Sequence, residues 1–273
     1  MIDTIVSMFS YGFMTRALIV GSLVSLCAAL LGVCLVLKRY SLIGDGLSHV
    51  GFGALSIALA LNMAPLKVAI PVVVIAAFLL LRITEKSRIK ADAAIALIST
   101  TALAVGVIVT SLSTGMNIDV YNYMFGSVLA MNQEDVVLSV ALCAVLLVLY
   151  GLFYHRIFAV TFDETFARAT GIRAEAYNML IALLTAVTIV LGMRMMGTML
   201  ISSLVIFPAL TAMRVFRRFS HVMVASAVIS VVCFFIGITV SFVSSIPAGA
   251  SVVVANCAAF LIFTLLKSIL RID

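Results

Sequence analysis

Two side chains that can bind a metal or carry a proton stand four residues apart near the start of a long apolar segment. They are Asp45 and His49, within the run 42–53. In a helix this spacing places both side chains on one face, about 6 Å apart along the axis. Carboxylate oxygen and neutral imidazole nitrogen are ligands for divalent metals such as zinc. Ionisable residues in membrane helices usually face a water-filled cavity or a partner. The pair therefore indicates metal ligands, or proton-relay groups, on a transport path.

A purely structural role explains the same two residues without transport. Asp45 could cap the start of the helix, because a carboxylate there accepts bonds from free backbone N–H groups. His49 could bond to a neighbouring backbone group. The residue types alone leave both interpretations open.

The composition indicates the kind of protein that carries the pair. The chain has 273 residues, of which 64% are hydrophobic and 10% charged. Repeated apolar runs of about 20 residues are what a bilayer core requires, and the alternating pattern of a membrane barrel is absent. The net charge of +6 comes from basic residues that separate the apolar runs. We therefore expect contacts with membrane lipid headgroups and none with nucleic acid.

We predict an all-α, polytopic helical membrane protein with about nine transmembrane helices and a single transmembrane domain over 1–273. Pro71 is expected to interrupt the third span, and the mixed region 113–135 leaves room for a short external half-helix. The five cysteines lie within spans and are expected to pack as small apolar residues. The expected spans are 14–37, 44–62, 67–82, 93–113, 136–154, 177–193, 197–213, 222–243 and 252–268.

The basic residues also predict the orientation. With the N-terminus outside and the C-terminus in the cytoplasm, only Arg16, Lys67 and Arg194 of the 17 Lys and Arg residues fall outside. Positive residues stay on the cytoplasmic side of membrane proteins. This orientation places Asp45 and His49 near the cytoplasmic end of their span.

The cytoplasmic connection 155–175 contains a predicted short helix outside the membrane. Asp163 and Glu164 stand at its start and Gly171 follows its end, as in a helix capped at both ends. A plain solvated connector has no need of Phe162 and Phe166. We expect these two aromatic side chains to dock on a partner protein.

The span 197–213 has the composition of a helix that moves against its neighbours. Small and hydroxylated residues, among them Ser202 and Ser203, allow helices to approach closely. Pro208 removes a backbone hydrogen bond and predicts a kink, at which Ser202, Ser203 or water could satisfy the freed carbonyl group. Ordinary static packing explains each of these residues equally well.

No catalytic motif is present. The chain has no phosphate-binding Gly-x-x-x-x-Gly-Lys-[Ser/Thr] loop, so it cannot drive transport with ATP by itself. An ion-coupled secondary transporter would use Asp45 and His49 as a proton relay, and an intramembrane enzyme would need a catalytic pair that the sequence lacks. Met193, Met195, Met196 and Met199 indicate either a soft-metal site or, as we prefer, flexible packing.

Four stretches of the chain resemble the membrane permease subunits of bacterial ABC-type importers for zinc, manganese and iron. Residues 37–49 are close to the family's Arg-Arg-x-Ser-Leu-x-Gly-Asp-Ala-x-Ser-His, with Gly46 in place of its alanine. The region 162–172 is like the family's ATPase-contacting loop. The stretch 197–209 is like its Gly-x-Leu-Leu-Val-x-Ala-Leu-Leu-Ile-x-Pro-Ala, and 247–250 precede the last span as in the family.

The resemblance implies a fold like the larger type II ABC importers in a bacterial plasma (inner) membrane. Two permease copies, expected to form a homodimer, would surround a central path, with cytoplasmic ATP-binding subunits inside and a separate metal-binding protein outside. This chain would hydrolyse no ATP and hold no permanent cofactor. The residues so implied are Asp45 and His49 for metal, Phe162, Asp163, Glu164, Phe166, Ala167 and Gly171 for ATPase contact, and Ser202, Ser203 and Pro208 for gating.

The transported metal is expected to be Zn²⁺, with Mn²⁺ or Fe²⁺ as alternatives. The runs around His49 and Pro208 look more like zinc members of the family than manganese members. An Asp–His pair is compatible with each of these ions, because intrinsic affinity separates them poorly.

Overall fold

The computed structural model of the chain describes residues 8, 10–86, 91–113 and 133–270, and this part contains helices and no strand. The expected external half-helix within 113–135 lies almost wholly outside the described residues. The helices are α2 (Gly12–Leu37), α3 (Ile43–Ala60), α4 (Pro65–Lys86), α5 (Ala91–Leu112), α7 (Gln133–Leu152), α8 (Tyr154–Phe162), α9 (Glu164–Ala169), α10 (Ala174–Met196), α11 (Thr198–Val215), α12 (Phe219–Ser244) and α13 (Ala248–Leu270).

Nine of the described helices are long and apolar enough to cross a membrane: α2, α3, α4, α5, α7, α10, α11, α12 and α13. Each coincides with one predicted span, so the predicted fold class is confirmed. The expected interruption at Pro71 was wrong, because α4 continues through this residue. Pro71 is the seventh residue of the helix, where it removes only one bond of the backbone ladder.

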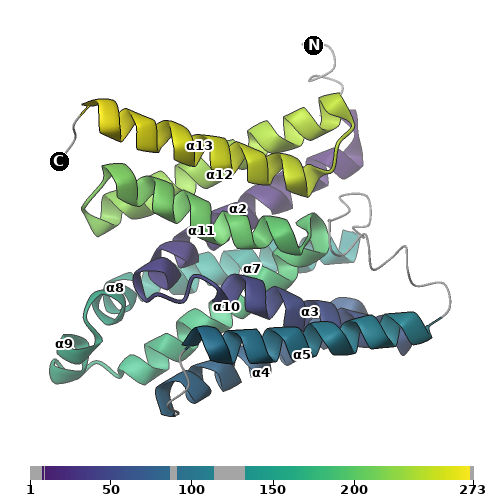
Figure 1. The fold of residues 1–273 in the computed structure, drawn as a ribbon, viewed down its shortest axis with the longest axis horizontal. Helices are drawn as coiled ribbons and strands as arrows, with labels where there is room; N and C mark the ends of the chain where they lie inside the picture. Colours follow the sequence, from purple (N-terminus) through teal and green to yellow (C-terminus); the bar gives the residue numbers. More distant parts are fainter. Residues whose placement is uncertain (1–7, 9, 87–90, 114–132, 271–273) are drawn as a thin grey trace.

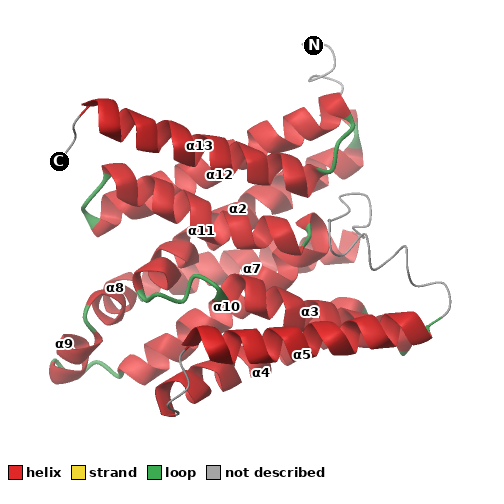
Figure 2. Cartoon of the chain, viewed as in Figure 1, coloured by secondary structure: helices red, strands yellow, loops and turns green. Residues whose placement is uncertain are grey.

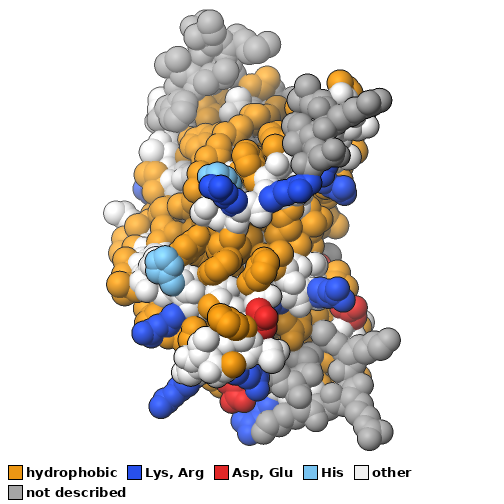
Figure 3. Space-filling view, turned by 90° about the vertical axis from the view of Figure 1, so that its left-hand side faces the viewer, with side chains coloured by type: hydrophobic (Ala, Val, Ile, Leu, Met, Phe, Trp, Pro, Cys, Tyr) orange, Lys and Arg blue, Asp and Glu red, His pale blue; other side chains and the backbone are white. Residues whose placement is uncertain are grey.

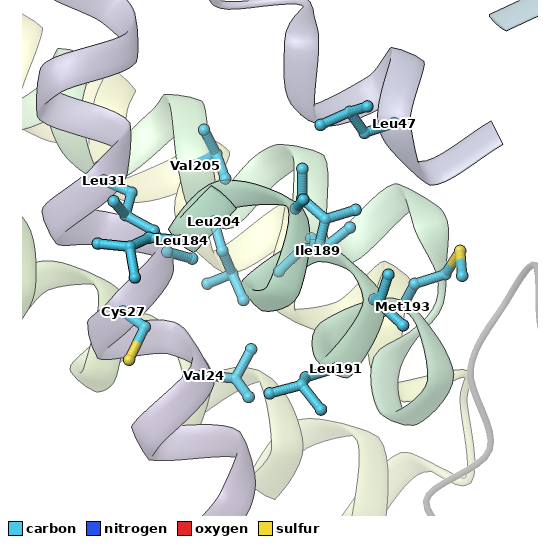
Figure 4. Close-up of a cluster of buried hydrophobic side chains, with 14 of the residues drawn as sticks. Val24, Cys27, Leu31, Leu47, Leu184, Ile189, Leu191, Met193, Leu204 and Val205 are labelled. Carbon is cyan, nitrogen blue, oxygen red and sulfur yellow. The ribbon is translucent and has the colours of Figure 1, made fainter. Parts of the chain in front are cut away.

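The core of the bundle lies around α2, which packs against α7, α10, α11 and α12. Figure 4 shows how side chains of α2, such as Leu31, meet Leu184 of α10 and Leu204 of α11. The closest approach is at Gly32, where a Cβ atom would lie 2.0 Å from the backbone oxygen of Val205. Only glycine allows α2 and α11 to pack at this distance.

Helix α3 is packed against α4, α5, α10 and α11. A Cβ atom at Gly53 would lie 2.6 Å from the backbone oxygen of Ala102, so α3 and α5 are also in backbone contact. Most residues of α3 are buried, which fixes the orientation of the few that are not.

A tightly hydrogen-bonded turn joins α2 to α3. The Tyr40 N–H donates to the Leu35 carbonyl (2.8 Å) and the Arg39 N–H to that of Val36 (3.1 Å). With Arg39 in the left-handed conformation (φ 62°), these bonds form a Schellman cap. The loop then runs along the bundle, and α3 begins well inside the end marked by α8 and α9 (Figure 2).

The helices α8 and α9 lie at one end of the bundle, outside the spans. Asp163 caps α9 by accepting a hydrogen bond from the Phe166 N–H (2.9 Å). Gly171 follows α9 with a φ of 84°, and the Ile172 N–H bonds to the Ala167 carbonyl (3.0 Å). The predicted helix with both of its caps is therefore confirmed. Lys and Arg side chains are spread over this end of the molecule (Figure 3).

Candidate metal site

Asp45 and His49 lie on one face of α3, in its first two turns. Nε2 of His49 is 3.6 Å from Oδ2 of Asp45, and the two side chains are 24% and 53% exposed, respectively. A carboxylate in the first turn of a helix is favoured by the helix dipole. The spacing that the sequence predicted thus places both polar atoms next to each other.

The pair occupies the open face of a helix that is otherwise enclosed. Its neighbours Gly44, Gly46 and Leu47 are all buried against other helices. Ser48 is turned away and donates to the backbone carbonyl of Asp45 (2.7 Å). A merely structural pair would need no access to the surface of the protomer, so this geometry favours a role in binding.

Ser202 of α11 joins the pair. Its hydroxyl donates to Oδ1 of Asp45 (3.4 Å) and to the Thr198 carbonyl (3.2 Å). Ser203 and Pro208, the other two residues predicted for the gating helix, are buried among neighbouring helices. Of these three residues, the structure therefore brings only Ser202 to the pair.

The contacts at the start of α3 show how this helix is placed against α11. Gly44 approaches Val205, and Val205 in turn contacts Gly32, five residues before the end of α2. The start of α3 therefore meets the first half of α11, although successive spans make these helices antiparallel. Full overlap would have paired the start of α3 with the end of α11. Within the span Ile43–Ala60 the pair lies near one end, as predicted, since Asp45 is in the first turn and His49 in the second.

One copy of the chain supplies an incomplete set of metal ligands. Among the described residues, no group of three or more His, Cys, Asp or Glu side chains is placed to hold a metal ion. Zinc is usually held by four ligands, or by three with one open position. A metal ion bound by Asp45 and His49 would therefore need further ligands from water or from another chain.

Two of the methionines near the junction of α10 and α11 pack against neighbouring helices. Met193 and Met196 are both buried. Their terminal methyl groups fill the space beside Gly51 and Gly21, respectively. Met199 is exposed.

The second region of interest is α9. Phe162 and Phe166, which stand before and within this helix, are 74% and 64% exposed, whereas Ala167 is fully buried in a small core with Val160 and Ala174. Beside them is an open pocket. Its lining residues are Arg156, Thr170, Gly171, Ile172, Arg173, Ala176 and Tyr177. The predicted aromatic docking residues are thus held on a fixed base and point outward.

Glu164 was predicted to contact a partner, but its carboxylate is turned toward its own chain. It accepts bonds from Lys38 (3.3 Å), Asn178 (3.1 Å) and Arg168 (2.7 Å). Burial raises the pKa of this carboxyl group, but the bonds from Asn178 and Arg168 and the charge of Lys38 outweigh burial and hold the pKa below its usual value. Lys38 and Asn178 were not identified from the sequence, because 140 residues separate them.

A buried ion pair lies away from both regions. Arg194 of α10 and Asp135 of α7 are 2.7 Å apart, and their side chains are 14% and 16% exposed. Sequence reasoning used Arg194 only for the orientation of the chain. The sequence contains no signal for this pair, because the two residues lie on different helices and residue spacing does not show which helices are in contact.

Comparison with known proteins shows to which family the chain is related. A family model described as the ABC 3 transport family matches residues 10–267. The manganese transport system membrane protein MntC of Halalkalibacterium halodurans is 28% identical over 253 residues, covering 93% of this chain and 87% of the relative. The high-affinity zinc uptake system membrane protein ZnuB of Haemophilus influenzae is 31% identical over 247 residues, covering 90% of this chain and 93% of the relative.

A solved structure has the same fold along nearly its whole length. PsaBC from Streptococcus pneumoniae, determined in complex with Fab, aligns with a TM-score of 0.87 at 26% identity. The alignment covers 98% of this chain and 99% of that chain.

Proposed function

The chain belongs to the ABC 3 transport family, and we propose that it is the membrane-spanning permease subunit of an importer that moves a divalent transition metal into the cytoplasm. The observation that carries this proposal is the Asp45–His49 pair, held 3.6 Å apart on the open face of the enclosed helix α3. A transported ion must be bound by few ligands and released again, and a half-exposed pair on a packed scaffold suits that need.

A second copy of the chain completes the site in this proposal. Two copies that meet along the open faces of α3 and α11 would supply two carboxylates and two imidazoles. Four such ligands match the tetrahedral coordination that zinc prefers. Two-fold symmetry also makes the same face serve both copies, as in most protein dimers.

The ATP-binding subunit docks on α9 in this proposal. Exposed Phe162 and Phe166, with the neighbouring pocket around Arg173, provide aromatic and cationic side chains of the kind that dominate protein interfaces. ATP hydrolysis belongs to that partner, because this chain has no phosphate-binding loop. An external metal-binding protein would meet the opposite end of the bundle.

The orientation in the plasma membrane follows from the same arrangement. The basic end of the bundle with α8 and α9 faces the cytoplasm, where the ATP-binding subunit lies. The start of α2 and the end of α13 lie at opposite ends of the bundle (Figure 1), so the N-terminus is outside and the C-terminus inside.

Zinc is our first choice of metal, and manganese and iron are the alternatives. Imidazole nitrogen suits zinc and iron, whereas manganese prefers sites rich in oxygen ligands. Relatives named for manganese and for zinc have similar identities of 28% and 31%. The choice therefore rests on the equal numbers of nitrogen and oxygen ligands in the proposed site.

A transport assay tests the proposal. The chain is reconstituted in liposomes with the ATP-binding subunit and external binding protein encoded beside it, and uptake of Zn²⁺, Mn²⁺ and Fe²⁺ is measured with and without ATP. We expect uptake that requires ATP and is fastest for Zn²⁺. Uptake driven by a proton gradient without ATP would instead favour a secondary transporter, in which Asp45 and His49 relay protons.

A further inference from the structure

A closed polar network ties the end of α2 to α9 and α10. The Lys38 ammonium donates to the Glu164 carboxylate (3.3 Å) and makes a short bond to the amide oxygen of Asn178. The Asn178 amide in turn donates to the same carboxylate (3.1 Å). Three side chains from three helices therefore hold one another in a triangle.

Two of the three side chains in the network are shielded from water, whereas the Glu164 side chain is 36% exposed. The Lys38 side chain is only 10% exposed, and Asn178 is buried. Hydrogen bonds between charged groups in such surroundings are stronger than those on a free surface. Lys38 is therefore held to α9 more firmly than it would be by an ion pair on the open surface, and it should follow α9 when that helix moves.

Apolar packing gives α9 no comparable tie to α2. The small core beneath α9 consists of Val160, Ala167 and Ala174 with their neighbours, all from α8, α9 and α10 and the turn between them. Glu164 is the residue of α9 that bonds to α2. The bond from Lys38 to Glu164 therefore links the end of α2 directly to α9.

Lys38 is also the first residue of the turn that leads to the metal pair. The Schellman bonds of Arg39 and Tyr40 hold this turn to the last turn of α2. The Ile43 N–H then donates to the Tyr40 carbonyl (3.0 Å) and the Gly46 N–H to the Leu42 carbonyl (2.9 Å). These bonds connect the turn both to the end of α2 and to the first turn of α3, so a shift of the turn would reach α3.

A small apolar pocket lies between the turn, α4 and α10. Its lining residues are Leu35, Lys38, Tyr40, Ile43, Leu81, Asn178, Ile181 and Ala182. The cavity measures only about 20 Å³, so it leaves room for small adjustments of the side chains of the turn.

We propose that Lys38 is the positioning residue through which movement of α9 reaches the helix that carries Asp45 and His49. This inference rests on the proposed function, in which α9 receives the ATP-binding subunit. Lys38 touches neither metal nor nucleotide. It transmits displacement from Glu164 through the turn to α3, and so links ATP hydrolysis to opening of the metal pair.

The experiment measures ATP hydrolysis and metal uptake in liposomes that hold the complete complex. In Lys38→Met, which keeps the length of the side chain without its charge, we expect hydrolysis to persist. Uptake per ATP should fall about tenfold, within the usual range of coupling between sites. Zn²⁺ binding before ATP is added should stay unchanged. Lys38→Arg should restore coupling, and Lys267→Met controls for the loss of one cytoplasmic-end charge.

A double-mutant cycle covers the case in which Lys38→Met alone weakens the complex. If Lys38 acts through Glu164, Lys38→Met in a Glu164→Gln background should cause no further loss of uptake per ATP. Two results would overturn this inference without affecting the proposed function, provided that the parental complex moves metal with ATP. One is a double variant whose loss of uptake per ATP equals the product of the two single losses, and the other is unchanged uptake per ATP in Lys38→Met. A parental complex that moves no metal would overturn the proposed function as well.

Discussion

The two polar regions of this chain differ in how completely their bonds are made. Lys38, Glu164 and Asn178 bond to one another within a single copy. Asp45 and His49 have each other and Ser202, and Asp45 remains half-exposed. A polar network completed within the chain holds helices together, whereas an unfinished one on a rigid scaffold is poised for a ligand.

The same contrast separates the surfaces around the two regions. Phe162 and Phe166 project outward from α9, whose underside is fixed by a small core. The helix α3, which carries Asp45 and His49, is held against α5 by the backbone contact between Gly53 and Ala102. In the proposed function, the first region presents side chains to a partner and the second presents ligands to an ion.

The largest expected effect comes from removing the unfinished pair. Asp45→Asn and His49→Ala should each lower metal uptake at least about 100-fold, more than the loss typical of a group outside the ligand shell. Insertion and assembly should be unaffected, because both side chains lie on an open face. Uptake is measured with radioactive metal in liposomes at equal amounts of folded complex.

Ile57 provides the matched control for this prediction. It is also exposed on α3, two turns beyond His49, and Ile57→Ala should leave uptake near the parental rate. Parental uptake in both Asp45→Asn and His49→Ala would contradict the metal-site assignment.

The next effect concerns the outward surface of α9. Phe166→Ala together with Phe162→Ala should weaken binding of the ATP-binding subunit about tenfold, as expected for central aromatic residues of an interface. Gly171→Pro should disturb the same surface, since a φ of 84° is closed to proline. Co-purification and ATP hydrolysis measure both changes.

An exposed aromatic residue away from α9 tests the specificity of that effect. Phe235 of α12 is partly exposed, and Phe235→Ala should leave co-purification unchanged. If the subunit remains bound to the Phe162 and Phe166 variant with coupled hydrolysis, the docking surface lies elsewhere, for example in the connection between α4 and α5.

The sequence predicted those features that depend on local chemistry. Apolar runs located all nine spans within a few residues, because a bilayer demands helices of this length and composition. Asp163 and Gly171 predicted both ends of α9, because each cap is made within a few residues of the chain. The i,i+4 spacing placed Asp45 beside His49 for the same reason.

Features that depend on the register between distant helices could not be predicted. The contact of Gly44 at the start of α3 with Val205 in the first half of α11 joins distant parts of the chain. The bond between Lys38 and Asn178 joins residues 140 positions apart. Spacing along one helix contains no information on either.

A smaller effect is expected from acid, and it separates the completed network from the open pair. The lowered pKa of Glu164 means that its bonds stabilise the folded chain above the ordinary glutamate pKa of about 4.3. That stability is lost as the pH falls through the still lower pKa of the folded state. Thermal unfolding of the purified chain in detergent should show this loss below about pH 4.

Glu164→Gln supplies the comparison for the acid experiment. The variant lacks the carboxylate, so it should start from a lower melting temperature at neutral pH and lose less on acidification. The control Glu175→Gln removes an exposed carboxylate in the first turn of α10 and should keep the parental acid response. An identical response in parent and Glu164→Gln would show that the network contributes no pH-dependent stability.

The smallest expected effect is at Pro208, which bears on whether α11 moves past the open pair. Proline provides no N–H for the Leu204 carbonyl. Ser202 and Ser203 were expected to compensate, but they donate to the carbonyls of Thr198 (3.2 Å) and Leu200 (2.9 Å) instead. The ladder of α11 is therefore weakened one turn and a half beyond the residue that contacts Asp45.

Pro208→Ala restores one backbone donor, and a helix with a complete ladder bends less readily. We expect insertion and folded yield to be kept, with uptake reduced roughly threefold, which corresponds to less than 1 kcal/mol in the barrier to repacking. Uptake and metal-stimulated ATP hydrolysis are measured per folded complex. A lower yield with unchanged turnover would make Pro208 a static packing residue, and the open pair would then depend on movement of α3 alone.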